Sequence, residues 1–186
     1  MRKLLLIVLV PLVLASCLYA TPSIQAGVSA VYGNYIGSES FADGLDDIGN
    51  YSFGAEFRFN PFGFISVVLP ATFGFDSSLM TINAYPSVNL NIGITKLVDV
   101  AAGVGVAFSF MNNDGDWTVN NLPLDEFSDA FMNANLFYRG AVTFNLGFIG
   151  LGLGANIPSK GSFNDFDAVP DWERTAVTAS VLLNFF

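Results

Sequence analysis

Four charged residues lie in segments whose other side chains alternate between apolar and small polar types: Glu56, Arg58, Asp99 and Arg139. Each falls on the polar row of its segment, so all four would face one side of a sheet. Buried charges are tolerated when they pair, and here two acids can neutralise two bases. We expect a network of ion pairs that closes the interior of the fold; the alternative is a gate or a proton relay.

Other chemistry is restricted by what the composition lacks. The sequence has no histidine and a single cysteine, Cys17, which excludes His-activated nucleophiles, His-ligated zinc and an intrachain disulfide. We therefore expect no enzyme activity, no metal site and no cofactor. The net charge of −9 comes from 16 acids against 7 bases, which excludes nucleic acid as a partner.

The polar rows belong to segments of period-two alternation, which is typical of β-strands. In residues 51–59, for example, Phe53 and Phe57 alternate with Gly54 and Arg58. Eight such segments are predicted, at residues 24–32, 51–59, 65–75, 80–90, 97–111, 132–144, 149–156 and 177–185. The 19 Phe and 18 Gly, with only 12% charged residues, favour an apolar all-β fold over helices.

The connections between these segments alternate in length. Short Asn- and Gly-containing turns are predicted at residues 60–63, 91–93 and 145–147. Between them, longer polar loops are predicted at 36–50, 112–129 and 158–173, and a short one at 76–79. Short turns at one end and long loops at the other are typical of a closed, up-and-down antiparallel transmembrane β-barrel. An even number of strands would place both mature termini with the short turns, on the periplasmic side of a bacterial outer membrane.

The two rows differ in a way that favours a lipid-facing exterior. One row is aliphatic or aromatic almost throughout, whereas the other is mostly Gly, Ser, Asn and Thr. A soluble barrel such as a lipocalin would need the opposite arrangement and would coat its surface with Gly103, Gly105, Gly150, Gly152 and Gly154. Aromatic residues also gather near both ends of the strands, as in the girdles of outer-membrane barrels.

The first twenty residues are typical of an export signal. A basic start, Arg2-Lys3, precedes the apolar run 4–14, which is too short to cross a bilayer as a helix. Cleavage after Ala20 would leave residues 21–186 as the barrel domain. Alternatively, residues 14–17 form a lipobox, and Cys17 would be acylated to become the first residue.

In this architecture, residues 21–186 resemble the small outer-membrane barrels of which the OmpA membrane domain and OmpX are the known types. The terminal Phe186 matches the aromatic residue that the barrel-assembly machinery reads in that family. The match at this end is partial, because the family's apolar row is in register with the terminal aromatic and here the row runs through Phe185. The resemblance implies outer-membrane lipid and the assembly machinery as partners.

The loops suggest two functions. All acidic residues except Glu56 and Asp99 lie in the predicted loops, where they solvate the surface or, alternatively, bridge divalent cations or bind a host. Trp117 and Trp172 in these loops would be adhesive anchors or loop-packing residues. We expect a non-enzymatic outer-membrane barrel with a side-chain-filled lumen and a structural role in the cell envelope. The alternative is a surface adhesin acting through its loops, and a narrow solute pore is a third possibility.

Overall fold

The computed structural model describes residues 22–76, 79–113 and 115–185. The predicted leader with Cys17, and the terminal Phe186, lie outside these ranges. The strands are β1 Ile24–Tyr32, β2 Tyr51–Phe59, β3 Ile65–Asp76, β4 Leu79–Ala84, β5 Ser87–Gly93, β6 Val98–Val106, β7 Phe108–Asn113, β8 Asp116–Val119, β9 Leu122–Pro123, β10 Leu136–Leu146, β11 Ile149–Pro158 and β12 Ala176–Phe185. The helical elements are η1 Ile48–Asn50, η2 Leu124–Glu126, α2 Phe127–Met132 and η3 Trp172–Arg174.

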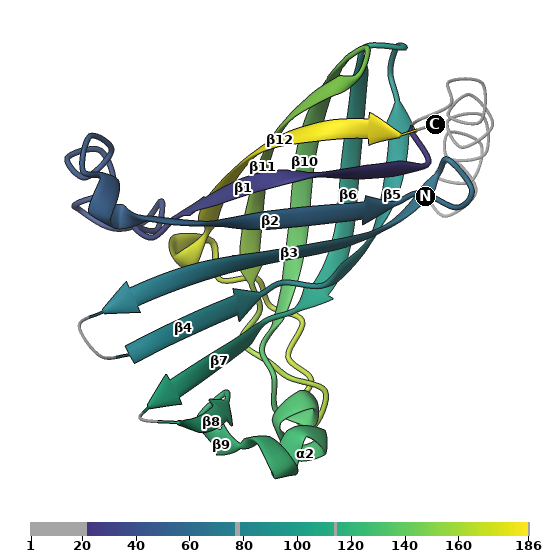
Figure 1. Cartoon of the computed structure of the whole chain (residues 1–186). Coiled ribbons are helices and arrows are strands. Elements are labelled where there is room, and N and C mark those ends of the chain that lie inside the picture. Colours follow the sequence, from purple (N-terminus) through teal and green to yellow (C-terminus); the bar gives the residue numbers. More distant parts are fainter. Residues whose placement is uncertain (1–21, 77–78, 114, 186) are drawn as a thin grey trace.

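The sheet closes on itself through the pairing of β1 with both β12 and β2 (Figure 1). The complete ring runs β1-β2-β3-β5-β6-β10-β11-β12, with every pair antiparallel. This is the predicted closed eight-stranded barrel. The short β2–β3, β5–β6 and β10–β11 connections lie at one end, here named the turn end, where β1 also begins and β12 also finishes. The long connections lie at the opposite end, named the loop end.

The assignment of the two rows to the two faces of the sheet is confirmed. Val28 on the apolar row is 64% exposed, whereas its neighbour Ser29 on the polar row is buried. On β12, Val181 and Phe185 face outward and Leu182 is fully buried. The pairing of Ile24 with Phe185 fixes the register of this last strand, with the apolar row running through Phe185.

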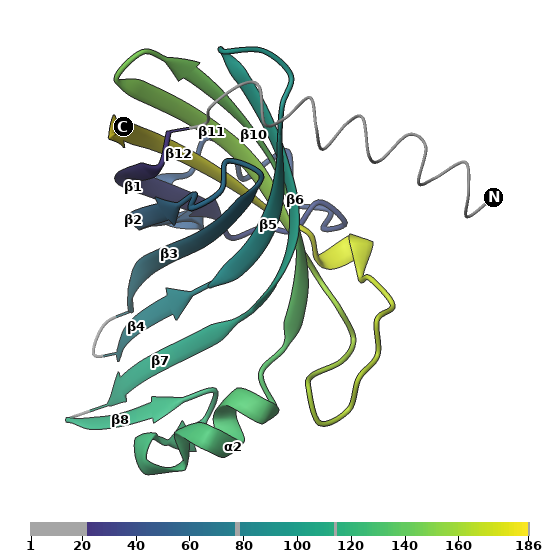
Figure 2. The same cartoon turned by 90° about the vertical axis from the view of Figure 1, so that its right-hand side faces the viewer.

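Two of the predicted strands are each divided in two. Residues 80–90 form β4 and β5, separated at Tyr85 and Pro86, and β3 pairs with both pieces. Pro70 of β3 lies opposite this break and its carbonyl accepts a hydrogen bond from the Tyr85 N–H (3.0 Å). Proline has no N–H for a ladder, so the pairing of β3 is interrupted between β4 and β5 apart from this hydrogen bond. The wall bends away from the barrel axis beyond this point (Figure 2).

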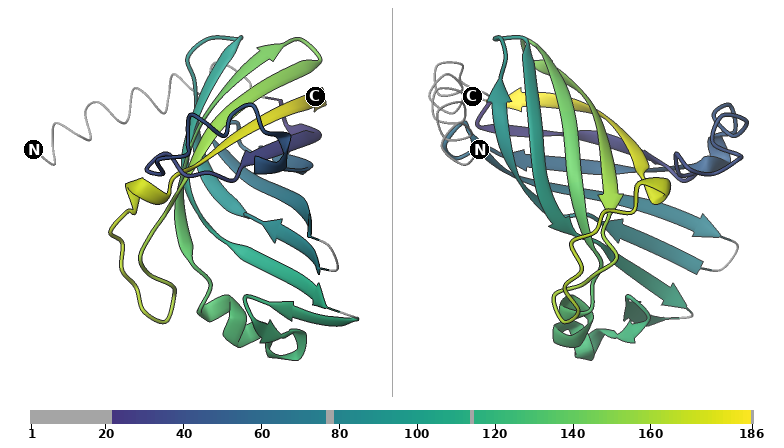
Figure 3. Two further views of the ribbon diagram at one scale, coloured as in Figure 1. Left: turned by 90° about the vertical axis from the view of Figure 1, so that its left-hand side faces the viewer. Right: turned by 180° about the vertical axis from the view of Figure 1, so that it is seen from behind.

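The second division, at Ala107, separates β6 from β7 and opens the wall. β6 pairs with β10 as far as Val106 and Leu136, but β7 pairs with β4 and β8 instead. The Asn120 side chain accepts the Ser109 N–H (2.9 Å), replacing a ladder bond at this edge. β10 begins at Leu136, and beyond that level β7 pairs with β8 rather than with the chain that leads into β10 (Figure 3).

The prediction of a strand over residues 132–135 is wrong. This segment belongs to α2 and the turn that follows it, and the predicted loop 112–129 contains β8, β9 and η2. The reason is tertiary packing: Phe127 and Phe131 of α2 stack on Phe108 at 5.8 and 5.9 Å between ring centroids. Phe108, which belongs to the predicted strand 97–111, is thereby buried in a small apolar cluster with Val119, Ala130 and Ala134.

The turns and helices complete the fold. Gly63 and Gly147 occupy two of the three predicted turns with positive φ. The third turn is wrong, because β5 continues through Gly93 and reverses at residues 94–97, where the Thr95 hydroxyl accepts the N–H groups of Leu97 and Val98 (3.1 Å each). None of the helices in the described part of the chain has the length and apolar character needed to cross a membrane.

Glycines in the wall provide a test of this packing. A Cβ added at Gly54 would lie 2.6 Å from the Cα of Thr72 in the neighbouring strand, whereas one added at Gly140 would meet no atom within 4 Å. Gly54→Ala should therefore lower the free energy of unfolding by about 1–3 kcal/mol. Gly140→Ala is the matched control and should be neutral or slightly stabilising. Urea unfolding followed by tryptophan fluorescence measures both; equal effects would contradict the strand packing.

Candidate functional site

The middle of the barrel interior holds a cluster of ion pairs centred on Glu56. Arg58, two residues along β2, donates through Nε to Glu56 Oε1, and Arg139 Nη2 from β10 lies 3.4 Å from the same oxygen. Arg58 also donates to the hydroxyls of Thr143 (2.7 Å) and Ser180 (3.2 Å). All three charged side chains are nearly completely buried. One carboxylate thus links two guanidinium groups across the lumen, which explains how these charges are tolerated.

Asp99, the fourth predicted member, lies apart in a layer nearer the turn end. Its carboxylate accepts a hydrogen bond from the Asn145 amide rather than from either arginine. Asn145 also accepts from Gln25 (3.3 Å), and Gln25 donates to Asn184 (2.7 Å). The structure therefore brings Glu56, Arg58 and Arg139 together and places Asp99 in a separate belt of amide side chains.

These layers leave almost no free volume at the level of the arginines. The cavity bordered by Arg58, Asp99 and Arg139 measures about 20 Å³, which is room for about one water molecule. The inward glycines contribute by leaving space for large neighbours: a Cβ added at Gly152 would lie 2.8 Å from Arg58 Nη2. The inward row therefore forms a plug of interlocking polar side chains.

Above the plug, the lumen widens toward the loop end. Tyr85 and Phe137 meet edge to face, with ring centroids 6.1 Å apart. Beyond them lies a cavity of about 640 Å³, here named the mouth cavity, whose lining includes Asn156, Lys160, Asp171 and Arg174. The prediction of charged interior residues did not include this space, because Lys160 and Arg174 belong to loop segments without alternation.

Asn156, which lines the mouth cavity, has polar atoms without hydrogen-bond partners. It is 5% exposed, and neither its amide nitrogen nor its amide oxygen has a partner in the described structure. Arg139 Nη1, at the level of the plug, also has none. Burying such atoms unpaired is costly, so unpaired groups beside a cavity point to water or a ligand that occupies it.

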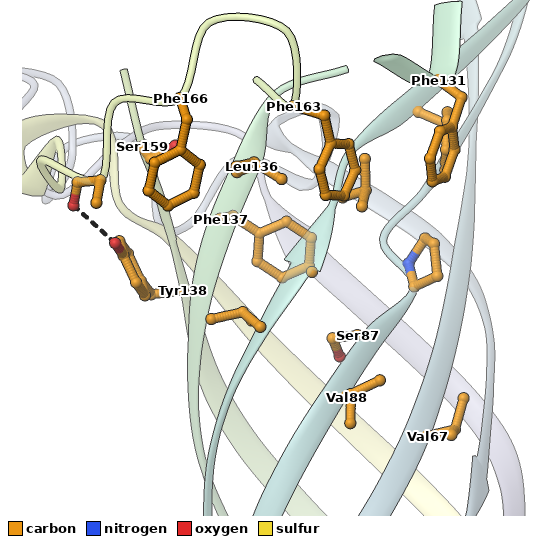
Figure 4. A pocket seen from close by; sticks show the side chains of 16 residues that line it. Val67, Ser87, Val88, Phe131, Leu136, Phe137, Tyr138, Ser159, Phe163 and Phe166 are labelled. Carbon is orange, nitrogen blue, oxygen red and sulfur yellow. Dashed lines mark hydrogen bonds between the residues drawn. The ribbon is translucent and has the colours of Figure 1, made fainter. Parts of the chain in front are cut away.

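A second cavity lies on the outside of the barrel, next to the opening in the wall. This side groove has a volume of about 540 Å³ and an almost entirely apolar lining (Figure 4). Val88 and Val104 form part of its floor, and Phe131, Phe163 and Phe166 come from α2 and the β11–β12 loop. Strand alternation predicted that the floor residues face outward, but nothing in a single sequence places the two loops over them.

Within residues 22–76, 79–113 and 115–185, no three Asp, Glu, Cys or His side chains gather as metal ligands would. The comparison with protein-family models and the comparison with curated proteins both find no match for this chain. We therefore infer the function from the fold and from the geometry of these cavities.

The ion pairs give a direct test through a double-mutant cycle. Arg139→Ala should destabilise the barrel by about 3–5 kcal/mol where the site is dry, because Glu56 and Arg58 then lose the balance of charge around them. Glu56→Ala should show a coupling free energy with Arg139→Ala. Asp99→Ala is the matched control and should be additive with it, because Asp99 contacts Asn145 instead. Coupling to Asp99 equal to that of Glu56 would contradict the two-layer arrangement.

Proposed function

We propose that this chain is a non-enzymatic barrel of a bacterial outer membrane, with a closed lumen and a structural role in the cell envelope. The observation that supports this is the inverted arrangement of side chains. Large apolar residues stay exposed around the ring, among them Val28, Phe57, Val104, Leu153 and Leu183, while Asn, Ser, Thr and Arg fill the interior. Soluble proteins rarely expose apolar surface on this scale, whereas a membrane barrel requires it.

The backbone supports the same proposal. In hydrocarbon, every N–H and C=O must be paired within the protein, and a closed ring of antiparallel strands meets this condition without leaving a free edge. Where β7 leaves the ring, β8 and Asn120 supply the missing partners. In this proposal the turn end, with both mature termini, is periplasmic and the loop end is external. The leader and Phe186 would serve export and recognition by the barrel-assembly machinery, as in the small outer-membrane barrels this architecture resembles.

A second candidate function is adhesion through the external loops. Trp172 and Phe166 are 64% and 71% exposed at the loop end, surrounded by exposed acidic residues such as Asp165 and Glu173. Large exposed aromatic residues commonly act as anchors at binding surfaces. Trp172→Ala with Phe166→Ala should abolish adhesion to host cells or matrix in that case and leave barrel assembly unchanged. If the unmodified protein shows no adhesion, the second candidate function is rejected and the structural role remains.

The membrane location is tested by introducing an arginine at either of two exposed apolar positions. Val28→Arg, mid-strand on the outward row, should lower folding stability in lipid by about 2–4 kcal/mol. Ile48→Arg in the β1–β2 loop is the matched control, since Ile48 is 74% exposed, and it should have little effect. Folding into lipid vesicles measures both variants. Equal tolerance of the two substitutions would indicate a soluble barrel.

The closed lumen predicts a lack of conductance. In planar bilayers the unmodified protein should show no large, stable channels, because the interior at the Arg58 level leaves about 20 Å³. Arg139→Ala should permit small, unstable conductance by removing part of the plug. Large stable channels in the unmodified protein would contradict the structural role and indicate a pore.

A further inference from the structure

We propose that the side groove and the mouth cavity form one binding site for an anionic single-chain amphiphile, such as a long-chain fatty acid. The acyl chain lies in the groove and the acidic head lies in the mouth cavity. The ligand enters from the surrounding lipid, so the proposal rests on the membrane location proposed above. It assigns a ligand to a barrel whose lumen is otherwise closed.

The groove is a built cavity with a floor and a roof. Outward residues of three strands, Val67, Val88 and Val104, lie along its floor. The roof comes from the β11–β12 loop, where Phe163 and Phe166 point over the groove (Figure 4). Its volume of about 540 Å³ lies in the range of sites that enclose small molecules.

The roof is held in place by specific contacts. Tyr138 Oη, on the outward row of β10, donates a hydrogen bond to the Ala168 carbonyl (2.7 Å). The Asn164 N–H donates to the Met132 carbonyl (3.0 Å), which ties the loop to the end of α2. Phe131 and Phe163 stack with ring centroids 5.2 Å apart. These contacts come from two elements, β10 and α2, so the roof is positioned by the fold.

The groove and the mouth cavity are adjacent where β6 ends. Phe108, Leu136, Phe137 and Ser159 line both cavities. The last backbone bond between the two segments here is from the Ala107 N–H to the Asn135 carbonyl (2.9 Å), and beyond it β7 pairs with β8 instead. A molecule seated here would contact an apolar surface on the outside of the barrel and a polar one at the mouth, which is the profile of an amphiphile.

The mouth cavity favours an acidic head. Besides Lys96 in a turn and the two lumen arginines, the basic residues of the described chain are Lys160 and Arg174, and both line this cavity. Asp171 offsets one of these two charges. Asn156 lines the same space with its amide group buried and unpaired. In a chain of net charge −9, two cations and a free amide donor at one opening are complementary to a carboxylate.

A second apolar depression on the barrel surface lacks a roof and a basic cavity, so it serves as a comparison for the side groove. It lies over β1, β2 and β10–β12, measures about 800 Å³, and is lined by strand residues such as Val28, Phe53, Leu153 and Val181. No loop residue lines it. Ordinary lipid chains would cover both surfaces, but only the side groove joins a roof to a basic polar cavity. The second depression is therefore the internal control.

The test uses a photoreactive palmitate, with a diazirine on its chain, added to the full-length protein in phosphatidylcholine nanodiscs. Crosslinked peptides are mapped by mass spectrometry, and unlabelled palmitate is the competitor. Labelling should concentrate on peptides that contain Val104 and Phe163 and should be lost on competition. Labelling spread evenly around the barrel, without competition, would overturn the proposal.

Variants then distinguish the proposed acyl-chain site in the side groove from the rest of the apolar barrel surface. Val104→Trp fills the groove floor and displaces about two methylenes of the chain, which should weaken palmitate binding by about tenfold. Val181→Trp, in the second depression, should leave binding unchanged. Val104 and Val181 are 58% and 49% exposed, so the pair is matched in environment. Equal effects of the two variants would overturn the proposal.

The head-group contact is tested by reversing charge. Lys160→Glu with Arg174→Glu should weaken binding of the photoreactive palmitate by about tenfold or more and should leave a photoreactive hexadecanol unaffected. Lys96→Glu, at the turn end, is the control. Equal loss of the acid and the alcohol would overturn the assignment of an acidic head. If the protein fails to enter nanodiscs, the proposed membrane function fails, and the same labelling performed in solution still tests the site.

Discussion

The pairing of β1 with β12 is the constraint on which the rest of the structure depends. Closing the ring at eight strands leaves an interior only as wide as its side chains, so each inward residue must fit there and a buried charge must be paired. Glu56 satisfies this condition by contacting both Arg58 and Arg139, and Gly152 leaves the space that Arg58 occupies. The alternation that buries these groups also exposes the apolar row, so the plug and the exterior follow from one pattern.

The loop end departs from this regular ring, and two prolines explain why. Pro70 and Pro86 cannot donate to the ladder, so β4 separates from β5, and the wall carrying β7 turns away from β10. Folding α2 over Phe108 covers apolar surface that this departure would expose. The mouth cavity and the side groove both arise where the ring is interrupted. Any binding function of this barrel is therefore expected at the loop end rather than through the plug.

Much of the barrel could be predicted from the sequence because period-two alternation fixes which face each residue occupies. The strand identities, the outward row and the burial of Glu56, Arg58 and Arg139 follow from it. Alternation carries no information on distances across the lumen, so the separation of Asp99 from the arginines could not be predicted. The prediction of a strand over residues 132–135 failed because Met132 and Ala134 continue the alternation by chance, while stacking on Phe108 determines the local structure. The groove depends on contacts between segments that are distant in sequence, and such contacts cannot be predicted from a single sequence.

The central claim, an apolar row that faces lipid and a polar row that faces a closed lumen, can be measured residue by residue. Spin labels placed singly at residues 24–31 of β1 other than Gly27, where a Cβ would lie 1.9 Å from the Val181 carbonyl oxygen, report accessibility to oxygen, which concentrates in hydrocarbon. The labels are placed in a Cys17→Ser background, with the protein in lipid vesicles. We expect a period-two pattern, high at Ile24, Ala26, Val28 and Ala30 and low at Gln25, Ser29 and Val31. Uniform accessibility, or maxima at the second set, would contradict it.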